Sequence, residues 1–307
     1  MGTDTSEDRV HDSLRLDWGT FSFKGSSNEE IGEVLGYLRD QIREMAGTHC
    51  IREGAGRRFF AHSIAAAPAG IQIRWSNLSA SVNPGCISVD FTGTFWGQTE
   101  AAERKELLLD LTEFDSFVKC TRLDAQRTID EPIADSEQIW ERIRNRTIWL
   151  PGYTGYTQGS VLNSAGQATG GASTTWGRPT AAVRCTTYNK AIEQKIFDQR
   201  AVRHEVRCRS AAAEGYFDAL MTALEQEGEE TENTTAERIV CSSILRKHMT
   251  YMDTTRYSHI KDRTKWPKNW KREVVPAALM DEILEEDLVV VKPGKRFHKR
   301  LAERKAW

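Results

Sequence analysis

The sequence of 307 residues predicts an α+β fold, with a mainly antiparallel β-sheet domain flanked by helices and a smaller, basic, helical C-terminal part. Segments in which apolar and polar residues alternate, as in half-buried strands, are interleaved with segments whose apolar residues recur at helical spacing. From Arg238 to the end there are 17 Lys and Arg against 9 Asp and Glu, although the whole chain has a net charge of −2. A hydrophobic content of 39% with 28% charged residues is typical of a globular protein that buries a core.

The first part of the chain predicts one strand and one helix. Residues 14–23, LRLDWGTFSF, are rich in aromatic and β-branched residues and end in a Gly-Ser turn, which predicts a strand. Ser27 and Glu30 have the spacing of a capping box, and apolar residues then recur at helical spacing. This pattern predicts a helix from about 28 to 46.

Two further strands and three further helices are expected in the body of the chain. The segments 71–75, IQIRW, and 86–91, CISVDF, alternate apolar and polar residues as half-buried strands do. Apolar periodicity predicts helices at 100–111, at 136–145, where Asp135 or Ser136 begins the helix, and at 211–224.

Two segments lack apolar periodicity. Residues 152–177 contain seven glycines and predict a long mobile loop before the strand that contains Tyr188. Residues 225–237 are acidic and polar and predict a linker. The expected organisation is therefore a sheet domain at 1–224, an acidic linker at 225–237 and a basic helical region at 238–307.

Composition argues against membrane and zinc-ribbon proteins. The polar N-terminus has no secretory signal, and no apolar run approaches the roughly 18 residues of a membrane span, so we expect a cytoplasmic protein with no membrane partner. The six cysteines stand singly, without a Cys-x-x-Cys pair, which fits reduced thiols. The basic C-terminal region favours phosphate as a partner, and a solvated charged face is the alternative.

Three predicted strands each have one ionised face, because residues two apart on a strand point the same way. If the three strands pair in one sheet, their polar faces form one surface with a tyrosine, two carboxylates and several arginines. For each strand alone, an ordinary solvent-facing surface is the alternative. The polar faces consist of Arg122, Asp124 and Gln126 in VKCTRLDAQRTID, of Arg184, Thr186, Tyr188 and Lys190 in VRCTTYNK, and of Arg203, Glu205, Arg207 and Arg209 in RHEVRCR.

This set of groups suits attack on a phosphodiester. Two carboxylates can bind a divalent cation such as Mg²⁺, which polarises a phosphate oxygen. Arginines supply forked donors for the other phosphate oxygens. A free tyrosine has a pKa of about 10 and needs nearby positive charge to act as a nucleophile at neutral pH, which Lys190 can provide.

Several segments resemble the plasmid rolling-circle replication initiation factors of the Rep_trans type, a family with filamentous-phage relatives. The order of an Arg-x-Asp strand, a Tyr-x-Lys strand and an Arg-x-Glu strand is kept in TRLDAQRTID (121–130), RCTTYNKAIE (184–193) and RHEVRCR (203–209). DWGTFSF, SVDFTGTFW (88–96) and DRTKWPKNW (262–270) resemble other segments of the family, so the resemblance covers about 14–272.

The resemblance implies a nicking and joining enzyme of DNA replication. Tyr188 is then the nucleophile that cleaves one strand at an origin, remains attached as a 5′-phosphotyrosine and leaves a 3′-OH. Asp124 and Glu205, with Asp130 as a weaker third, are the ligands of a divalent metal, Mg²⁺ or Mn²⁺. From charge chemistry, we expect the scissile phosphate to be held by Arg122, Arg184, Lys190, Arg203 and Arg207.

The chain departs from the family in the turn at 176–180, in the unusually long glycine-rich insertion before that turn, and in the spacing from Arg184 to Tyr188. Where the family has Gly-Ser-Arg, residues 176–180 read Trp-Gly-Arg-Pro-Thr, so the DNA contact expected of Arg178 rests on an altered turn. Three residues instead of one separate Arg184 from Tyr188, which puts Thr186 in the place of the usual arginine. There is no His-x-His pair, which favours an acidic metal site over the histidine cluster of other nicking enzymes.

Three other residues are alternatives to these assignments. Tyr153 and Tyr156 rival Tyr188 as the nucleophile, but a loop would position them poorly for in-line attack. A general-base role is conceivable for His204, but its parity places it on the apolar side, which favours a core histidine.

The basic C-terminal region is expected to contact DNA. Seven Lys and Arg lie between residues 256 and 272, with tryptophans among them, and such residues bind the phosphate backbone and stack on unpaired bases. The alternative is that the tryptophans form the core of a small helical subdomain. The residues expected at DNA are Lys265, Trp266, Trp270, Lys271 and Arg272, and the further partners expected are a second copy of the chain and a helicase.

Three functions therefore remain open. The first is a tyrosine-dependent replication initiator. The second is a DNA-binding regulator that has the same scaffold without the chemistry. The third is a metal-dependent phosphodiesterase that uses water, with Tyr188 only structural.

Overall fold

The computed structural model describes residues 10–46, 52–56, 59–153, 155–159, 172–196, 198–226, 235–260 and 265–284. Its main element is a ten-stranded sheet in the order β2-β3-β4-β5-β1-β6-β11-β10-β9-β8, and a second sheet pairs β12 with β7. Helices flank the large sheet, which confirms the α+β class. The strands are β1 (Ser13–Lys24), β2 (Arg52–Ala55), β3 (His62–Ala66), β4 (Ile71–Trp75), β5 (Cys86–Phe91), β6 (Phe117–Asp130), β7 (Ile148–Trp149), β8 (Tyr156–Gly159), β9 (Ser173–Trp176), β10 (Val183–Asn189), β11 (Ala201–Arg209) and β12 (Met252–Asp253).

The helices expected from the sequence are present. The predicted helix at 28–46 is α1, and Asp135 is the N-cap of α4, where it accepts a hydrogen bond from the Gln138 N–H. The helices are α1 (Asn28–Ala46), α2 (Gly93–Gln98), α3 (Ala101–Glu113), α4 (Ser136–Arg144), α5 (Lys190–Glu193), α6 (Ala211–Gln226), α7 (Thr235–His248), α8 (Trp270–Glu273) and α9 (Met280–Ile283), with a 3₁₀ turn, η3, at Thr255–Tyr257.

The described chain divides into two compact units whose segments alternate along the sequence. Of the described residues, unit 1 contains those within 10–15, 125–207 and 241–284, and unit 2 contains those within 16–124 and 208–240. Strands β1, β6 and β11 each contribute residues to both units. Both units therefore combine segments that are far apart in the sequence.

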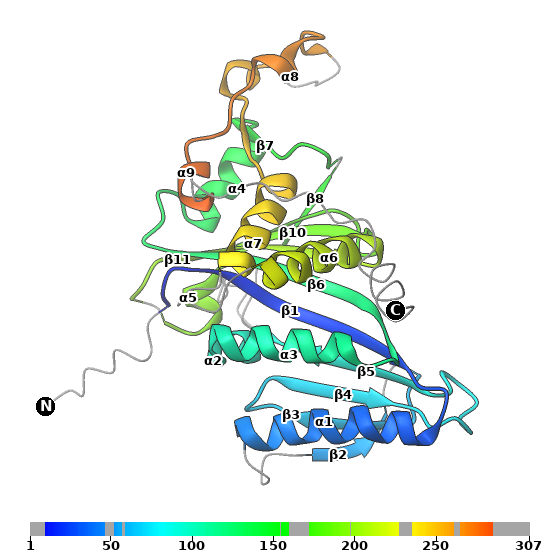
Figure 1. Cartoon of the computed structure of the whole chain (residues 1–307). Helices are drawn as coiled ribbons and strands as arrows, with labels where there is room; N and C mark the ends of the chain where they lie inside the picture. Colours follow the sequence, from blue (N-terminus) through cyan, green and yellow to red (C-terminus); the bar gives the residue numbers. More distant parts are fainter. Residues whose placement is uncertain are drawn as a thin grey trace, which may run out of the picture. The chain divides into compact units, whose positions relative to one another are not determined.

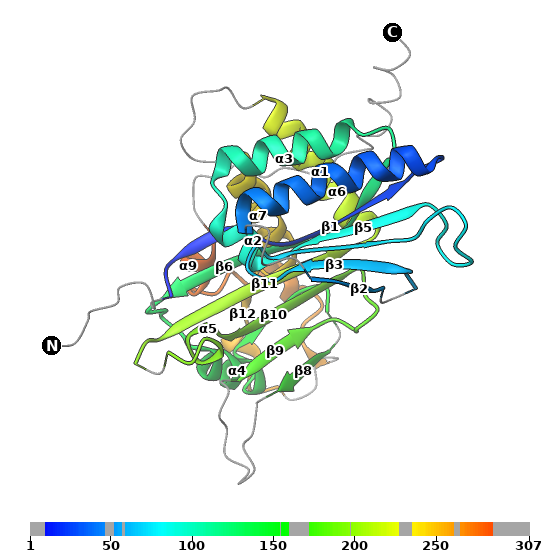
Figure 2. The same ribbon diagram turned by 90° about the horizontal axis from the view of Figure 1, so that it is seen from below.

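In unit 2, helices α1, α3 and α6 cover one face of β1, β3, β4 and β5 (Figures 1 and 2). The apolar residues that alternate along the strands form the core on this face, where the Phe21 ring contacts Phe91 and Phe217 edge-on at 5.8 and 5.2 Å between ring centroids. Polar residues of the same strands point to the other face. In β1, for example, the partly exposed Thr20 and Ser22 alternate with the buried Phe21 and Phe23.

Unit 1 contains an antiparallel segment formed by β8, β9 and β10, which α4 contacts. Thr187 of β10 is paired with Thr174 of β9, and Tyr156 of β8 is paired with Trp176 of β9. The expectation of a structureless loop over 152–177 is therefore wrong at both ends, where backbone pairing forms strands despite the glycine content. Residues 160–171 lie outside the described part of the chain.

Of the expected linker at 225–237, residues 227–234 lie outside the described part of the chain, while α6 extends to Gln226 and α7 begins at Thr235. Glu237 is buried, accepts a hydrogen bond from the Leu16 N–H at 2.9 Å and pairs with Arg104 at 2.9 Å. These contacts anchor the start of α7. Within the described residues, no helix is both long and apolar enough to cross a membrane.

Candidate active site

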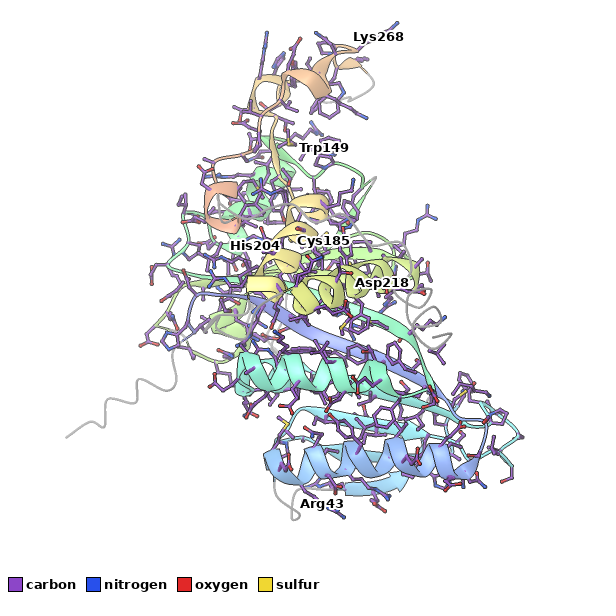
Figure 3. The ribbon with its side chains drawn as sticks, viewed as in Figure 1. Arg43, Trp149, Cys185, His204, Asp218 and Lys268 are labelled. Carbon is purple, nitrogen blue, oxygen red and sulfur yellow. The ribbon has the colours of Figure 1, made fainter. Side chains whose placement is uncertain are left out.

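Tyr188 lies near the end of β10, on the face opposite to that strand's buried residues. Cys185 and Thr187 are buried, whereas Arg184, Thr186 and Tyr188 are partly exposed. On the buried side, the Cys185 sulfur lies 3.1 Å from the Tyr153 hydroxyl and 3.2 Å from the carbonyl oxygen of His248, the last residue of α7. Cys185 and His204 are labelled in Figure 3. The alternation expected from the sequence is therefore present on this strand.

The polar residues of β11 that belong to unit 1 lie on the same face as Tyr188. A hydrogen bond of 3.0 Å between Thr187 Oγ1 and His204 Nδ1 shows that these two residues share the buried face. Because side chains alternate, the neighbours of His204, Arg203 and Glu205, share the opposite face with Tyr188, and so does Arg207. Arg203 is itself buried, and its Nε donates to Thr128 Oγ1 at 2.9 Å.

Lys190 begins the short helix α5 instead of continuing β10. Asn189 is the N-cap of this helix, and its side chain accepts a hydrogen bond from the Ile192 N–H at 2.9 Å. The Lys190 ammonium still lies 5.9 Å from the centre of the Tyr188 ring, and it forms an ion pair with Glu193. Lys190 therefore lies near Tyr188 as the first residue of α5 and not as a further residue of β10.

Each of the two main acidic residues forms an ion pair with an arginine of its own strand. In unit 1, Glu205 pairs with Arg207 at 3.1 Å, and the Glu205 side chain is 12% exposed. In unit 2, the Asp124 side chain is 0% exposed, and Arg122 contacts both of its carboxylate oxygens with two nitrogens. The Arg122 guanidinium also stacks on Trp18, 4.2 Å from the ring centre.

The expected metal ligands do not form a three-residue cluster. Across the described ranges, no three His, Cys, Asp or Glu side chains are close enough together to bind a metal ion. Asp130 accepts a hydrogen bond from Gln199 Nε2 at 2.7 Å, which ties the end of β6 to the segment before β11. Asp124 and Glu205 supply hard oxygen ligands of the kind that Mg²⁺ takes one or two at a time, completed by water and phosphate.

The three residues named as alternatives, Tyr153, Tyr156 and His204, do not share the strand face of Tyr188. Tyr153 bonds to Cys185, and the Tyr156 ring contacts Trp176, the residue paired with Cys185, so both tyrosines lie on the side away from Tyr188. His204 is 1% exposed and is a buried core residue. This burial, with a smaller contribution from Arg127, lowers its pKa to about 3. An imidazole with so low a pKa binds a proton too weakly to be an efficient general base near neutral pH.

The basic C-terminal segment contains an aromatic cluster. The Trp266 ring contacts Tyr257 and Trp270, Trp270 also contacts Trp149, and the Trp266 Nε1–H donates to the Ile260 carbonyl. Trp266 is 5% exposed, so the core alternative holds for this residue and its ring is not available to a base. Lys265, Lys271 and Arg178 are exposed, Trp270 is partly exposed, and the Arg272 side chain lies outside the described part.

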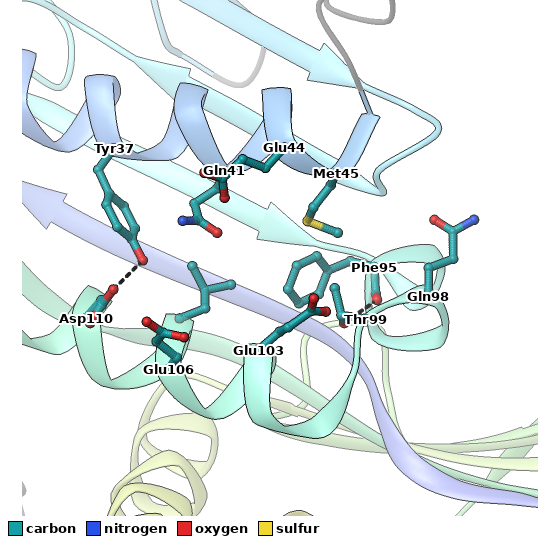
Figure 4. Close-up of a pocket in the computed structure, with 11 residues that line it drawn as sticks. Tyr37, Gln41, Glu44, Met45, Phe95, Gln98, Thr99, Glu103, Glu106 and Asp110 are labelled. Carbon is teal, nitrogen blue, oxygen red and sulfur yellow. Dashed lines mark hydrogen bonds between the residues drawn. The ribbon is translucent and has the colours of Figure 1, made fainter.

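A pocket of about 580 Å³ lies between α1 and α3 in unit 2 (Figure 4). Phe95 and Leu107 are among the residues that line it, and the Tyr37 hydroxyl donates a hydrogen bond to Asp110 at 2.8 Å. Burial and this carboxylate raise the pKa of Tyr37. The lining has no Lys or Arg but four carboxylates, which would repel a phosphate, so we place no phosphodiester chemistry here. These are Glu44, Glu103, Glu106 and Asp110.

On the face of the unit 2 strands opposite to the helices, four polar side chains form a hydrogen-bonded network that could not be predicted from the sequence. Trp18 Nε1 donates to Thr20 Oγ1 at 3.1 Å, Thr20 donates to Asp90 at 2.7 Å, and Asp90 pairs with Arg74 at 2.6 Å. Since Arg122 stacks on Trp18, this network supports Arg122 from three neighbouring strands. The only signal in the sequence was the polar alternation in DWGTFSF, IQIRW and CISVDF.

Comparison with known structures addresses the fold directly. The structure titled "Structure of Rolling Circle Replication Initiator Protein from Geobacillus stearothermophilus" superposes with a TM-score of 0.58 over 91% of this chain and 99% of that one. This chain has the fold of a rolling-circle replication initiator. The two sequences are only 15% identical, so the likeness is one of fold.

Other comparisons add no further relationship. No family model matches the sequence, and no curated protein matches it. The structure of DynU16, a putative protein in the dynemicin biosynthetic locus, aligns with 73% of this chain and 94% of that one at 11% identity. Its TM-score of 0.15 is too low to indicate a shared fold. The fold of the initiator agrees with the resemblance found in the three strand motifs.

Proposed function

We propose that this protein initiates rolling-circle replication by nicking one DNA strand through Tyr188 and later rejoining it. The observation that supports this most directly is the arrangement in unit 1. Tyr188 shares one face with Glu205 and several arginines, and the Lys190 ammonium lies 5.9 Å from its ring. The fold of the initiator from Geobacillus stearothermophilus supports the same class of activity.

In the proposed reaction the Tyr188 oxygen attacks the phosphorus of one phosphodiester. The phenol proton is released to water, a bond forms between the phenol oxygen and phosphorus, the bond from phosphorus to the 3′ oxygen breaks, and the leaving 3′ oxygen takes up a proton from water to become a 3′-OH. Rejoining is the reverse step. Lys190 favours negative charge on the phenol oxygen, while Arg184, Arg203 and Arg207 offer donors to the non-bridging oxygens.

We further propose that Asp124 and Glu205 bind Mg²⁺ or Mn²⁺, with Asp130 as a weaker candidate. The ion would supply Lewis-acid polarisation of the phosphate. Arg122 and Arg207, which now neutralise the two carboxylates, would have to turn toward the phosphate when the ion binds. In the free protein these arginines neutralise the two carboxylates, and with DNA bound they would donate hydrogen bonds to the phosphate.

DNA is the proposed partner. The exposed Arg178, Lys265 and Lys271 suit the phosphate backbone, and the partly exposed Trp270, with Lys271 5.9 Å from its ring, suits an unpaired base. Arg272 belongs to the same basic segment. A plasmid origin as the target, a second copy of the chain and a helicase as partners, and a cytoplasmic location complete the proposal.

The test uses single-stranded oligonucleotides of randomised sequence, labelled at the 3′ end, with Mn²⁺ present. A 5′-phosphotyrosine joins the labelled fragment to the protein, so a labelled band of protein size in a denaturing gel reports the reaction. We expect wild type and Tyr156→Phe to give the band and Tyr188→Phe to give none. Cleavage without any covalent band would favour a water-using phosphodiesterase, and binding without cleavage would favour a regulator.

A further inference from the structure

Three buried polar side chains of unit 1 form a hydrogen-bonded cluster on the reverse face from Tyr188. Thr187 Oγ1 lies 3.0 Å from His204 Nδ1 and 2.9 Å from the Tyr251 hydroxyl. Tyr251 is 0% exposed, and Thr187 and His204 are 1% exposed. We call these residues, Thr187, His204 and Tyr251, the clamp.

The clamp connects three segments that are separate in the sequence. Thr187 belongs to β10, His204 to β11, and Tyr251 to the segment between α7 and β12. The backbone of Tyr251 is fixed in turn, because its carbonyl accepts a hydrogen bond from the Ala277 N–H at 2.8 Å and its N–H donates to Met280 Sδ at 3.2 Å. The hydroxyl that contacts Thr187 is therefore held from the C-terminal segment.

Each strand residue of the clamp directly precedes a residue of the proposed active site. Tyr188 follows Thr187, and Glu205 follows His204. Because successive side chains of a strand point to opposite faces, fixing Thr187 against His204 also fixes how Tyr188 and Glu205 are presented on the other face. A slip of one residue would turn these side chains to the wrong side.

A purely apolar contact would not provide this specificity. Buried polar groups cost free energy unless they are hydrogen-bonded, so a relative position of the strands that keeps both hydrogen bonds is favoured over one that breaks them. The neighbouring strand offers a comparison. Thr174 of β9 is paired with Thr187 and equally buried, but its Oγ1 has no hydrogen-bond partner within the described residues.

We propose that Thr187, His204 and Tyr251 are positioning residues that hold Tyr188 and Glu205 in register for attack on the scissile phosphate. This inference rests on the proposed nicking function. It assigns to the buried face of the sheet a role in the reaction on the opposite face, without contact with DNA.

The test compares Thr187→Val with Thr187→Ser and with Thr174→Val as the matched control. Single-turnover adduct formation at saturating labelled oligonucleotide gives the rate, and fluorescence anisotropy gives the Kd. For Thr187→Val we expect the rate to fall by about 10- to 100-fold, the loss typical of a small misplacement of reacting groups, with little change in Kd. Thr187→Ser should restore the rate, and Thr174→Val should leave it unchanged.

Two further measurements keep the proposal falsifiable. If the clamp acts as a unit, the double variant Thr187→Val, Tyr251→Phe should be no slower than Thr187→Val alone. Hydrogen exchange of the Tyr188 and Glu205 amides should accelerate in Thr187→Val but not in Thr174→Val. Equal rates and equal hydrogen exchange in Thr187→Val and Thr174→Val would overturn the proposed role of the clamp. A wild-type protein that forms no adduct would overturn the proposed function, and in that case the hydrogen exchange alone tests the clamp.

Discussion

Tyr188 and Glu205 lie on the same face of their two strands, because the residues that precede them, Thr187 and His204, are joined by a 3.0 Å hydrogen bond on the other face. This relationship places a phenol and a carboxylate on one surface of unit 1. It is independent of the family resemblance, since it follows from side-chain alternation and one buried contact. Tyr153 and Tyr156 contact Cys185 and Trp176, whose side chains point to the face opposite to that of Tyr188.

Lys190 should set the reactivity of Tyr188. We expect Lys190→Met to lower the rate of adduct formation at pH 7 by about tenfold, because loss of roughly 1.4 kcal/mol of charge stabilisation at the phenol oxygen gives that factor. Glu193→Gln removes the carboxylate that pairs with Lys190, and it should leave the rate equal or higher. Single-turnover kinetics of the two variants make the comparison, and a slower Glu193→Gln with an unchanged Lys190→Met would argue against this role.

Metal removal should abolish nicking. We expect EDTA to prevent adduct formation by the wild type and added Mn²⁺ to restore it. Glu205→Gln should weaken Mn²⁺ binding, which electron paramagnetic resonance of free Mn²⁺ measures without DNA. The matched control is Glu193→Gln, an exposed acid of the same unit that should bind Mn²⁺ as the wild type does. Full activity in EDTA would exclude the proposed metal site.

The buried ion pair of Arg74 and Asp90 should be important for stability. Their side chains are 5% and 4% exposed, so Asp90→Asn should lower the free energy of unfolding by about 3–5 kcal/mol, because it leaves a buried charge uncompensated. The control is Asp40→Asn, which removes the partner of Arg43 in a surface pair with side chains 64% and 54% exposed. That change should cost about 0–1 kcal/mol. Urea unfolding measures the free energy of unfolding of both variants. Equal losses in the two variants would contradict the burial of the Arg74–Asp90 pair.

Stability should fall as the pH is lowered from 7.5 to 5. Burial lowers the pKa of His204 to about 3 and of His248 to about 4, from an ordinary value of 6.5. The unfolded chain therefore binds protons below pH 6.5 that the folded chain does not bind, so this stability is complete above 6.5 and is lost as the pH falls. Each histidine contributes about 2 kcal/mol over this range. The free energy of unfolding of His204→Asn should depend less on pH than that of the wild type. An equal pH dependence in the two proteins would contradict the burial of His204.

Much of the fold could be predicted from local patterns in the sequence. The helix α1 and the strands β4 and β5 have the expected bounds, because capping residues and apolar spacing are local signals. The hairpin of β8 and β9 was missed, because its glycine-rich segment has no apolar alternation and is stabilised by pairing with β10 and by the Tyr156–Trp176 contact. The order of the strands depends on long-range contacts and has no local signal.

The candidate site was predictable in part for the same reason. Parity along each strand correctly placed Arg184 and Tyr188 on one face and His204 on the other. Parity cannot show partners from distant segments, so it missed Tyr251, which bonds to Thr187, and Trp18, which stacks with Arg122. It also could not show that Asp124 and Glu205 are each neutralised by an arginine.

The most direct test of Tyr188 as the nucleophile is to identify the residue that carries DNA. The wild-type protein is incubated with Mn²⁺ and the randomised single-stranded oligonucleotides, the covalent adduct is digested with nuclease and protease, and the peptides are analysed by mass spectrometry. We expect a nucleotide 5′-phosphate on the Tyr188 oxygen. A phosphate on Tyr153, Tyr156 or any other residue, or an adduct that forms equally in Tyr188→Phe, would contradict the proposed role of Tyr188.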